Sequence, residues 1–231
     1  SFVVYSMEAT VNNAEVRNIP LKDWKADLDA VYAAIDENTR VVVFANPSNP
    51  IGTAISNKDL HEFVKKVPES TLVVIDEAYN EFNADDADYE DTAHYLSDCP
   101  NLVISRTFSK AYGLAGLRIG YMLTNPEIAS LLNRLRAPFN VNLIALEAAI
   151  AAIDDEEHLR KVVENNTCQR ARYAEFCKQH NLFMIPSCAN FVAIDFSGHD
   201  AQKIAAVLNK MVTVAGHEEE TTPLEVIESY L

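Results

Sequence analysis

Lys110 stands among residues that could support nucleophilic chemistry on a carbonyl group. It follows an apolar run, residues 102–104, and a stretch that contains Ser105, Arg106, Thr107 and Ser109. A lysine attacks a carbonyl carbon as the free amine, and burial or neighbouring cations lower its pKa toward that form. Hydroxyl and guanidinium groups beside it could hold an anion. A lone Ser-Lys pair after a strand ordinarily lies at the surface and has no catalytic role. The elements around Lys110 must therefore show whether it has one.

Three apolar, β-branched runs, residues 41–45, 72–75 and 102–104, predict strands that are buried on both faces of a parallel sheet. They end near residues 46, 76 and 106, and a repeat of about thirty residues is the length of a strand-helix-strand unit. Ser56 is a predicted N-cap for a helix over residues 57–66. We expect a short helix near residues 93–96 and a further strand over residues 120–123.

The ends of these predicted strands carry polar residues that are far apart in the sequence. Ligands in open α/β sheets bind beyond the carboxyl ends of the strands. We therefore expect Asn49, Asp76, Tyr79 and Lys110 to converge on one site.

The second part of the chain has a helical pattern. Residues 127–135 predict one helix, and residues 143–180 predict two more, divided by the acidic cluster at 154–157. A strand over 190–196 and a helix over 201–209 complete the pattern. The predicted fold is α/β: a mostly parallel sheet flanked by helices, with part of a small α/β domain.

The composition is that of an ordinary globular chain of 231 residues, 48% hydrophobic and 23% charged. The formal net charge of −15 argues against nucleic acid or an anionic membrane as the main partner. No apolar run approaches the roughly 18 residues of a membrane span. The four cysteines lack Cys-x-x-Cys spacing and neither they nor the six histidines show metal-ligand spacing, so we predict no metal site. Thiols in a reducing compartment are expected.

Residues 105–121, Ser-Arg-Thr-Phe-Ser-Lys-Ala-Tyr-Gly-Leu-Ala-Gly-Leu-Arg-Ile-Gly-Tyr, resemble the lysine motif of pyridoxal-phosphate (PLP) aminotransferases of the aspartate aminotransferase fold. The histidinol-phosphate aminotransferase branch is the most similar. The resemblance extends over residues 1 to about 210, and its motifs occur in the family's order. By this resemblance we expect the chain to lack the family's N-terminal arm and glycine-containing phosphate loop. No arginine follows Arg172, so the arginine for the substrate carboxylate also falls outside the sequence.

The resemblance implies roles for the residues at the strand ends. Lys110 corresponds to the lysine that forms a Schiff base with PLP and then moves protons as general base and acid. Asp76 would pair with the pyridine nitrogen and keep it protonated. Asn49 and Tyr79 would donate hydrogen bonds to the ring phenolate. Lys110, Asp76 and Tyr79 are thus the predicted catalytic residues.

The remaining predicted cofactor contacts are to the phosphate and to the face of the ring. Thr107, Ser109 and Arg118 match the phosphate-binding positions, and Phe2 matches an aromatic ring stacked on the pyridine. Tyr5 is expected to serve packing. Arg106 is omitted because an adjacent residue on an extended backbone points the other way. Glycines 113, 116 and 120 would permit the turns that return Arg118 toward Lys110.

By resemblance, the function is transfer of an amino group between an amino acid or amine and a 2-oxo acid, as in histidine biosynthesis. A cytoplasmic homodimer is expected. The predicted domains are a large PLP-binding domain over residues 1–145 and an interdomain helix with a small domain over 146–231, both incomplete.

The cofactor motifs leave alternatives open. An aromatic amino acid aminotransferase or a PLP-dependent decarboxylase would carry the same residues. A non-catalytic PLP-binding module, such as the sensor domain of a transcription regulator, is a further alternative, although the acidic balance and the absence of a basic DNA-binding segment count against it.

Overall fold

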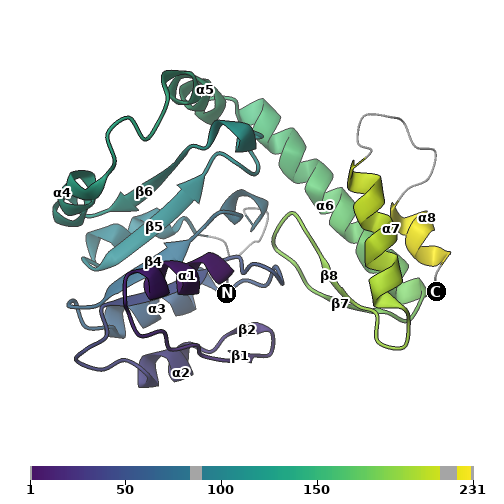
Figure 1. The fold of residues 1–231 in the computed structure, drawn as a ribbon, viewed down its shortest axis with the longest axis horizontal. Coiled ribbons are helices and arrows are strands. Elements are labelled where there is room, and N and C mark those ends of the chain that lie inside the picture. Colours follow the sequence, from purple (N-terminus) through teal and green to yellow (C-terminus); the bar gives the residue numbers. More distant parts are fainter. Residues whose placement is uncertain (1, 84–89, 214–222, 230–231) are drawn as a thin grey trace.

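The computed structural model describes residues 2–83, 90–213 and 223–229 (Figure 1). Its main sheet has four strands in the order β3-β4-β5-β6. The first three are parallel and the fourth is antiparallel to its neighbour. The strands are β3 (Val41–Ala45), β4 (Leu72–Asp76), β5 (Leu102–Thr107) and β6 (Gly120–Thr124). This arrangement confirms the predicted, mostly parallel sheet.

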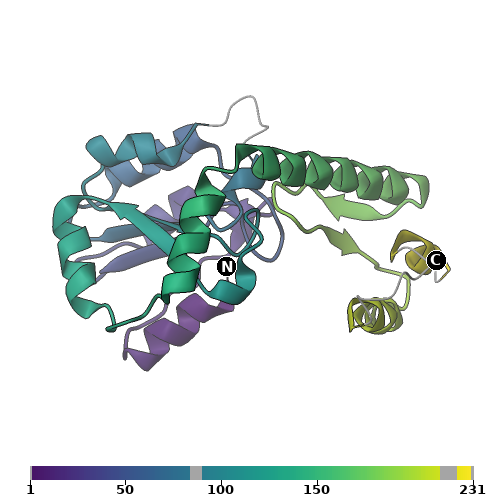
Figure 2. The same cartoon turned by 90° about the horizontal axis from the view of Figure 1, so that it is seen from above.

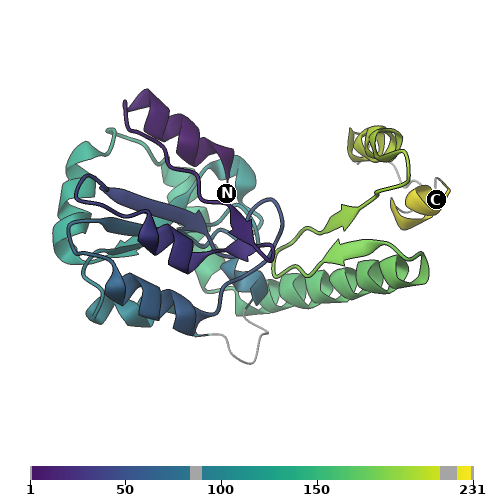
Figure 3. The same ribbon diagram turned by 90° about the horizontal axis from the view of Figure 1, so that it is seen from below.

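Helices cover both faces of this sheet. Helix α1 (Val3–Val11) and helix α3 (Asn57–Lys66) lie on opposite faces, as Figures 2 and 3 show from above and below. Ser56 caps α3 as predicted, accepting a hydrogen bond from the Asp59 amide. One face of α3 packs in the main core with strand residues such as Val73 and Ile75. The α3 residues in that core are Leu60, Phe63 and Val64.

Smaller elements complete this part of the chain. They are β1 (Leu21–Lys22), β2 (Lys25–Ala26), α2 (Leu28–Ala33), and the 3-10 helices η1 (Asn80–Asn83), η2 (Thr92–Ser97) and η3 (Ala115–Leu117). Two further helices, α4 (Pro126–Leu135) and α5 (Leu143–Ile153), follow β6. Ala145 and Ala149 of α5 pack against Phe108 and Ile119, so α5 supports the loop that carries Lys110.

A long helix, α6 (Glu156–Gln179), leads away from the sheet to the C-terminal elements (Figure 1). These are β7 (Phe183–Ile185), β8 (Ala193–Asp195), α7 (Ala201–Thr213) and α8 (Pro223–Glu228). They share a second core formed by Phe176, Cys177, Ile204 and Ile227. None of the helices in the described ranges combines the length and the apolar character needed to cross a membrane.

The predicted division of residues 143–180 is confirmed, because Asp155 caps α6 by accepting a hydrogen bond from the His158 amide at 3.0 Å. The predicted strand over 190–196 is too long. Its partner β7 has only three residues, which pair with residues 193–195, and Pro186 follows without an N–H to extend the ladder. The short helix predicted near residues 93–96 is present as the 3-10 helix η2.

Candidate active site

Adjacent strands bring the predicted residues to one edge of the sheet. Asp76 at the end of β4 lies in register between Ala45 of β3 and Ser105 of β5. The segments that leave these three strand ends carry Asn49, Tyr79 and Lys110. The convergence expected from the spacing of the apolar runs is therefore present.

Lys110, Tyr79 and Asn49 form the centre of the site. The Lys110 Nζ lies 5.3 Å from the centroid of the Tyr79 ring. Asn49 Nδ2 donates a hydrogen bond of 2.8 Å to the Tyr79 hydroxyl. The Tyr79 ring is buried, and the Phe191 ring meets it edge-on with centroids 5.1 Å apart. Three segments that are distant in sequence, those of Asn49, Lys110 and Phe191, thus surround the Tyr79 phenol.

The loop that carries Asn49 is fixed against the segment between β7 and β8. Gly52 has a φ of 83°, and a Cβ on it would clash with the side chain of Ser187. The Gly52 carbonyl accepts a hydrogen bond of 2.7 Å from the Cys188 amide. Only glycine allows both this backbone conformation and this approach. The C-terminal elements therefore help to position Asn49.

Both oxygens of the Asp76 carboxylate have defined donors. Oδ1 accepts a hydrogen bond of 3.1 Å from the Ala78 amide, and Oδ2 accepts one from the Tyr5 hydroxyl. Burial, together with the Asp76 carboxylate, raises the pKa of Tyr5, so its hydroxyl stays a donor. Tyr5, which the sequence assigned to packing, is instead a polar partner of the candidate catalytic carboxylate.

Sequence reasoning missed Tyr5 because it did not predict α1. That helix buries none of its residues completely, so it lacks a strong apolar face. Had the helix been recognised, the spacing of Phe2 and Tyr5 would have placed both near one face. Their rings meet with centroids 5.8 Å apart, and Phe2 is partly exposed. The stacking role of Phe2 stays a prediction.

Thr107, Ser109 and Arg118 lie together in the turn after β5. Thr107 Oγ1 accepts a hydrogen bond of 3.1 Å from the Ser109 amide. Arg118 Nη1 donates to the Ser109 Oγ at 3.2 Å and to the Ala115 carbonyl at 2.9 Å. Gly113, with a φ of 72°, helps to turn the chain back toward β5. Two hydroxyls and an exposed guanidinium are thereby gathered beside Lys110.

Arg106 belongs to a different cluster. Its Nη2 lies 2.8 Å from the Glu77 Oε2 and 2.5 Å from the Asp91 Oδ1. Glu77 is 1% exposed and also accepts a hydrogen bond from Thr92. Burial raises the pKa of Glu77, while Arg106 and the hydrogen bond from Thr92 oppose that rise. We call Glu77, Asp91, Thr92 and Arg106 the buried ion-pair cluster, although the Asp91 side chain at its edge is 40% exposed.

The polar and charged side chains at the strand ends fit PLP, the cofactor that the sequence resemblance implies. PLP has an aldehyde, a ring nitrogen, a phenolate oxygen and a phosphate. The site has an amine for the aldehyde and a carboxylate for the protonated nitrogen. It also has an amide beside a phenol for the phenolate, and two hydroxyls with a guanidinium for the phosphate.

Comparisons with known proteins agree with this chemistry. Residues 1–221 match the family model "Aminotransferase class I and II". Histidinol-phosphate aminotransferase 2 of Haemophilus influenzae (strain 86-028NP) is 45% identical over 214 residues, which are 93% of this chain and 58% of that protein. The chain therefore spans less than two thirds of that relative.

Solved structures share the fold. The structure of histidinol-phosphate aminotransferase from Sinorhizobium meliloti in complex with pyridoxal-5'-phosphate matches with a TM-score of 0.82 and 34% identity, over 97% of this chain and 61% of that one. A Thermus thermophilus aspartate aminotransferase variant matches with a TM-score of 0.76 at 20% identity, over 89% of this chain and 60% of that one, and supports the fold alone. Because the family model extends over nearly the whole chain and the fold agrees, this chain belongs to the aminotransferase class I and II family.

Proposed function

We propose that the protein containing this chain is a PLP-dependent aminotransferase of the histidinol-phosphate type. It would move an amino group between an amino acid or amine and a 2-oxo acid. The observation that carries the proposal is the convergence of Lys110 with Tyr79, Asn49 and the Thr107-Ser109-Arg118 turn, in a member of this family. The 45% identity to a histidinol-phosphate aminotransferase supports the substrate class.

PLP, when bound, supplies the electron sink that makes a substrate Cα–H bond acidic. The chain's own residues would do the rest. The Lys110 amine would first hold the cofactor and then carry the proton away from and back to the substrate carbon. Asp76, held by Tyr5 and the Ala78 amide, would keep a proton on the ring nitrogen.

The other residues would orient the cofactor. Asn49 and Tyr79 would hydrogen-bond to the phenolate oxygen. Thr107, Ser109 and Arg118 would bind the phosphate, with Arg118 supplying the positive charge. Phe2 would stack on the ring. The division into domains between residues 145 and 146 stays a prediction. We also propose a cytoplasmic location, because the four cysteines are thiols rather than disulfides.

We also propose a homodimer. Large apolar side chains of α4, α5 and the segment between them are exposed: Leu135 by 84%, Phe139 by 99%, Leu143 by 72% and Ile144 by 73%. Exposed apolar groups of this size and number mark contact surfaces. Sedimentation of the natural-length protein should give twice the monomer mass. A monomer at micromolar concentration would contradict the dimer.

Assays on the natural-length protein, purified with PLP, test the proposed activity. Amino transfer to 2-oxoglutarate is measured with L-histidinol phosphate, phenylalanine and tyrosine as donors. We expect the highest kcat/KM with histidinol phosphate. A preference for the aromatic amino acids would assign a different aminotransferase, and carbon dioxide release without amino transfer would assign a decarboxylase. Tight PLP binding without turnover of any donor would indicate a non-catalytic module.

A further inference from the structure

Three side chains with metal-binding atoms meet at the end of the sheet opposite the active site. His61 lies in α3, while Asp98 and Cys99 lie in the turn between η2 and β5. Lys110 follows the other end of β5, so this cluster is separate from the aminotransferase residues. The sequence predicted no metal site here, because 37 positions separate His61 from Asp98.

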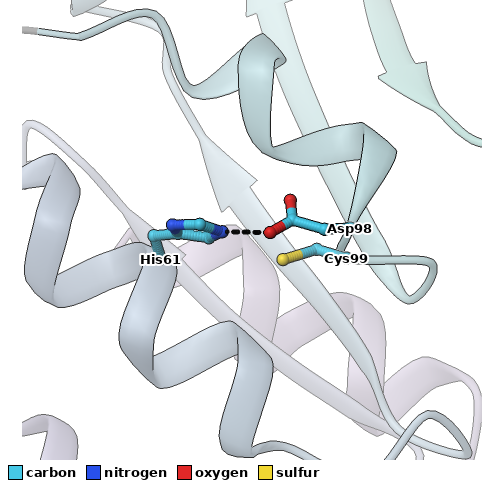
Figure 4. A group of neighbouring side chains, drawn as sticks. All are labelled: His61, Asp98 and Cys99. Atoms are coloured by element: carbon cyan, nitrogen blue, oxygen red, sulfur yellow. Dashed lines mark hydrogen bonds and ion pairs between the residues drawn. The ribbon is translucent and has the colours of Figure 1, made fainter.

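The three potential ligand atoms are close together. His61 Nε2 lies 2.9 Å from the Asp98 Oδ2, and the nitrogen, the oxygen and the Cys99 sulfur all lie within 4.8 Å of one another. Figure 4 shows the imidazole edge facing the carboxylate, with the Cys99 sulfur directed toward the same gap. One nitrogen, one oxygen and one sulfur therefore surround a common point.

The surroundings of His61 hold its ring in this orientation. The imidazole stacks on the Tyr95 ring with centroids 4.0 Å apart and planes 4° apart. Tyr95 is itself fixed, because its hydroxyl donates a hydrogen bond of 2.6 Å to Glu90. A ligand ring that is held before the metal arrives loses little freedom on binding.

Burial differs between the two sides of the cluster. Cys99 is 2% exposed, whereas the side chains of His61 and Asp98 are 26% and 46% exposed. The sulfur thus lies on the protein side, and the imidazole and carboxylate face solvent. A metal ion could enter from solvent and keep a water molecule as a fourth ligand.

We propose that His61, Asp98 and Cys99 bind a divalent transition-metal ion, with Zn²⁺ as the best match. Zinc takes imidazole nitrogen, carboxylate oxygen and thiolate sulfur in tetrahedral sites, at about 2.0–2.3 Å from the metal. Ligand atoms in such a site are separated by about 3–4 Å, as those bond lengths require. The distance of 2.9 Å between His61 and Asp98 is near that range, and a small side-chain rotation would bring in the sulfur.

Lys65 provides a way to strengthen the site rather than destroy it. Its Nζ lies 3.7 Å from the Asp98 Oδ2, where its positive charge competes with a metal ion for the same oxygen. Because the lysine side chain is 54% exposed, its replacement should disturb the fold little. Lys65→Ala should therefore bind Zn²⁺ about two- to fivefold more tightly, the scale of an exposed ion pair.

Zn²⁺ binding to the natural-length protein, freed of metal by a chelator, tests the proposal. Equilibrium dialysis with buffered Zn²⁺ should show one ion that depends on this cluster. Cys99→Ser and His61→Ala should each weaken that binding by at least about tenfold, because even the loss of an outer-shell partner costs about 10- to 100-fold in metal affinity. Cys168→Ser and His158→Ala, at exposed positions of α6, are matched controls that should bind as the wild type does.

Circular dichroism of each variant shows whether it is folded. The tighter Zn²⁺ binding expected of Lys65→Ala cannot be explained by a damaged fold, because damage would weaken binding. X-ray absorption at the zinc edge should show one sulfur ligand, which Cys99→Ser removes. Absence of bound zinc, or equal binding by the wild type, Cys99→Ser and His61→Ala, would overturn the proposal. The cluster would then be only an ion pair that joins α3 to the turn before β5.

Discussion

Two groups of charged and polar side chains lie on opposite sides of the ends of β4 and β5. They differ in how completely their charges are paired with opposite charges. Asp76 and Thr107 contribute to the candidate active site, while Glu77 and Arg106, each one residue away, belong to the buried ion-pair cluster. Neighbouring residues on extended backbone point to opposite sides, which separates the two groups.

In the buried cluster, the opposite charges satisfy one another. Arg106 contacts both Glu77 and Asp91, and Glu77 also binds Thr92. Within the described residues, by contrast, neither Lys110 nor Arg118 has a carboxylate partner. The buried cluster therefore stabilises the strand ends, whereas Lys110 and Arg118 stay available to an anionic ligand.

Replacing Asp76 by Asn should produce the largest effect, and on activity alone. The amide cannot hold a proton on the ring nitrogen by charge, so we expect kcat to fall about 10³-fold, the scale of a lost electrostatic contact. Thermal melting should change little because the amide keeps the shape of the carboxylate. Turnover near that of the wild type would refute the role of Asp76.

Replacing Arg106 by Ala should have the converse effect, on stability. It leaves Glu77 buried without its cation, and breaking such a pair costs about 3–5 kcal/mol in the free energy of unfolding. Urea denaturation measures this loss. Arg160→Ala, at an exposed pair on α6, is the matched control and should cost about 0–1 kcal/mol. Equal effects of the two substitutions would show that the buried cluster is not a special source of stability.

Glu81 is a second carboxyl group whose pKa is raised by burial and lowered by the charge of Arg106. Burial raises the pKa of Glu81 from 4.5 to about 7, and Arg106 opposes this only in part. The folded state therefore holds the proton more tightly, so stability is greatest below pH 4.5 for this group and falls as the pH rises toward 7. Above pH 7 the ionisation of Glu81 lowers the free energy of unfolding by about 3 kcal/mol relative to its value below pH 4.5.

Glu81→Gln removes that ionisation. The variant should gain stability relative to the wild type at pH 8 and little at pH 5, measured by thermal melting at both values. A difference that does not change between the two pH values would show that Glu81 titrates normally in the folded protein.

Tyr5→Phe should give the smallest of these effects. It removes one hydrogen bond to the Asp76 carboxylate and leaves the ring in place. A hydrogen bond to a charged group contributes about 1.5–3 kcal/mol. We expect a loss at the lower end, about tenfold in kcat/KM, because the Ala78 amide still holds the other oxygen. Tyr32→Phe, at an exposed position, is the control. Unchanged kinetics of Tyr5→Phe would make the contact dispensable.

The sequence predicted the features that depend on local pattern. Continuous β-branched runs marked the parallel strands, and the rule that ligands bind at their carboxyl ends brought Asp76 and Lys110 together in advance. The features it missed depend on long-range contacts. Tyr5 meets Asp76 across 71 positions, and His61 meets Asp98 across 37. Strand β7 has only three residues, too short for periodicity to reveal.

The most direct test of the central claim is to locate the lysine that bonds to the cofactor. The natural-length protein is incubated with PLP, reduced with borohydride, digested and sequenced by mass spectrometry. Lys110 should carry the label, and Lys110→Ala should be unlabelled while it still folds and melts cooperatively. A label on a different lysine, or undiminished labelling of Lys110→Ala, would contradict the assignment of the active site.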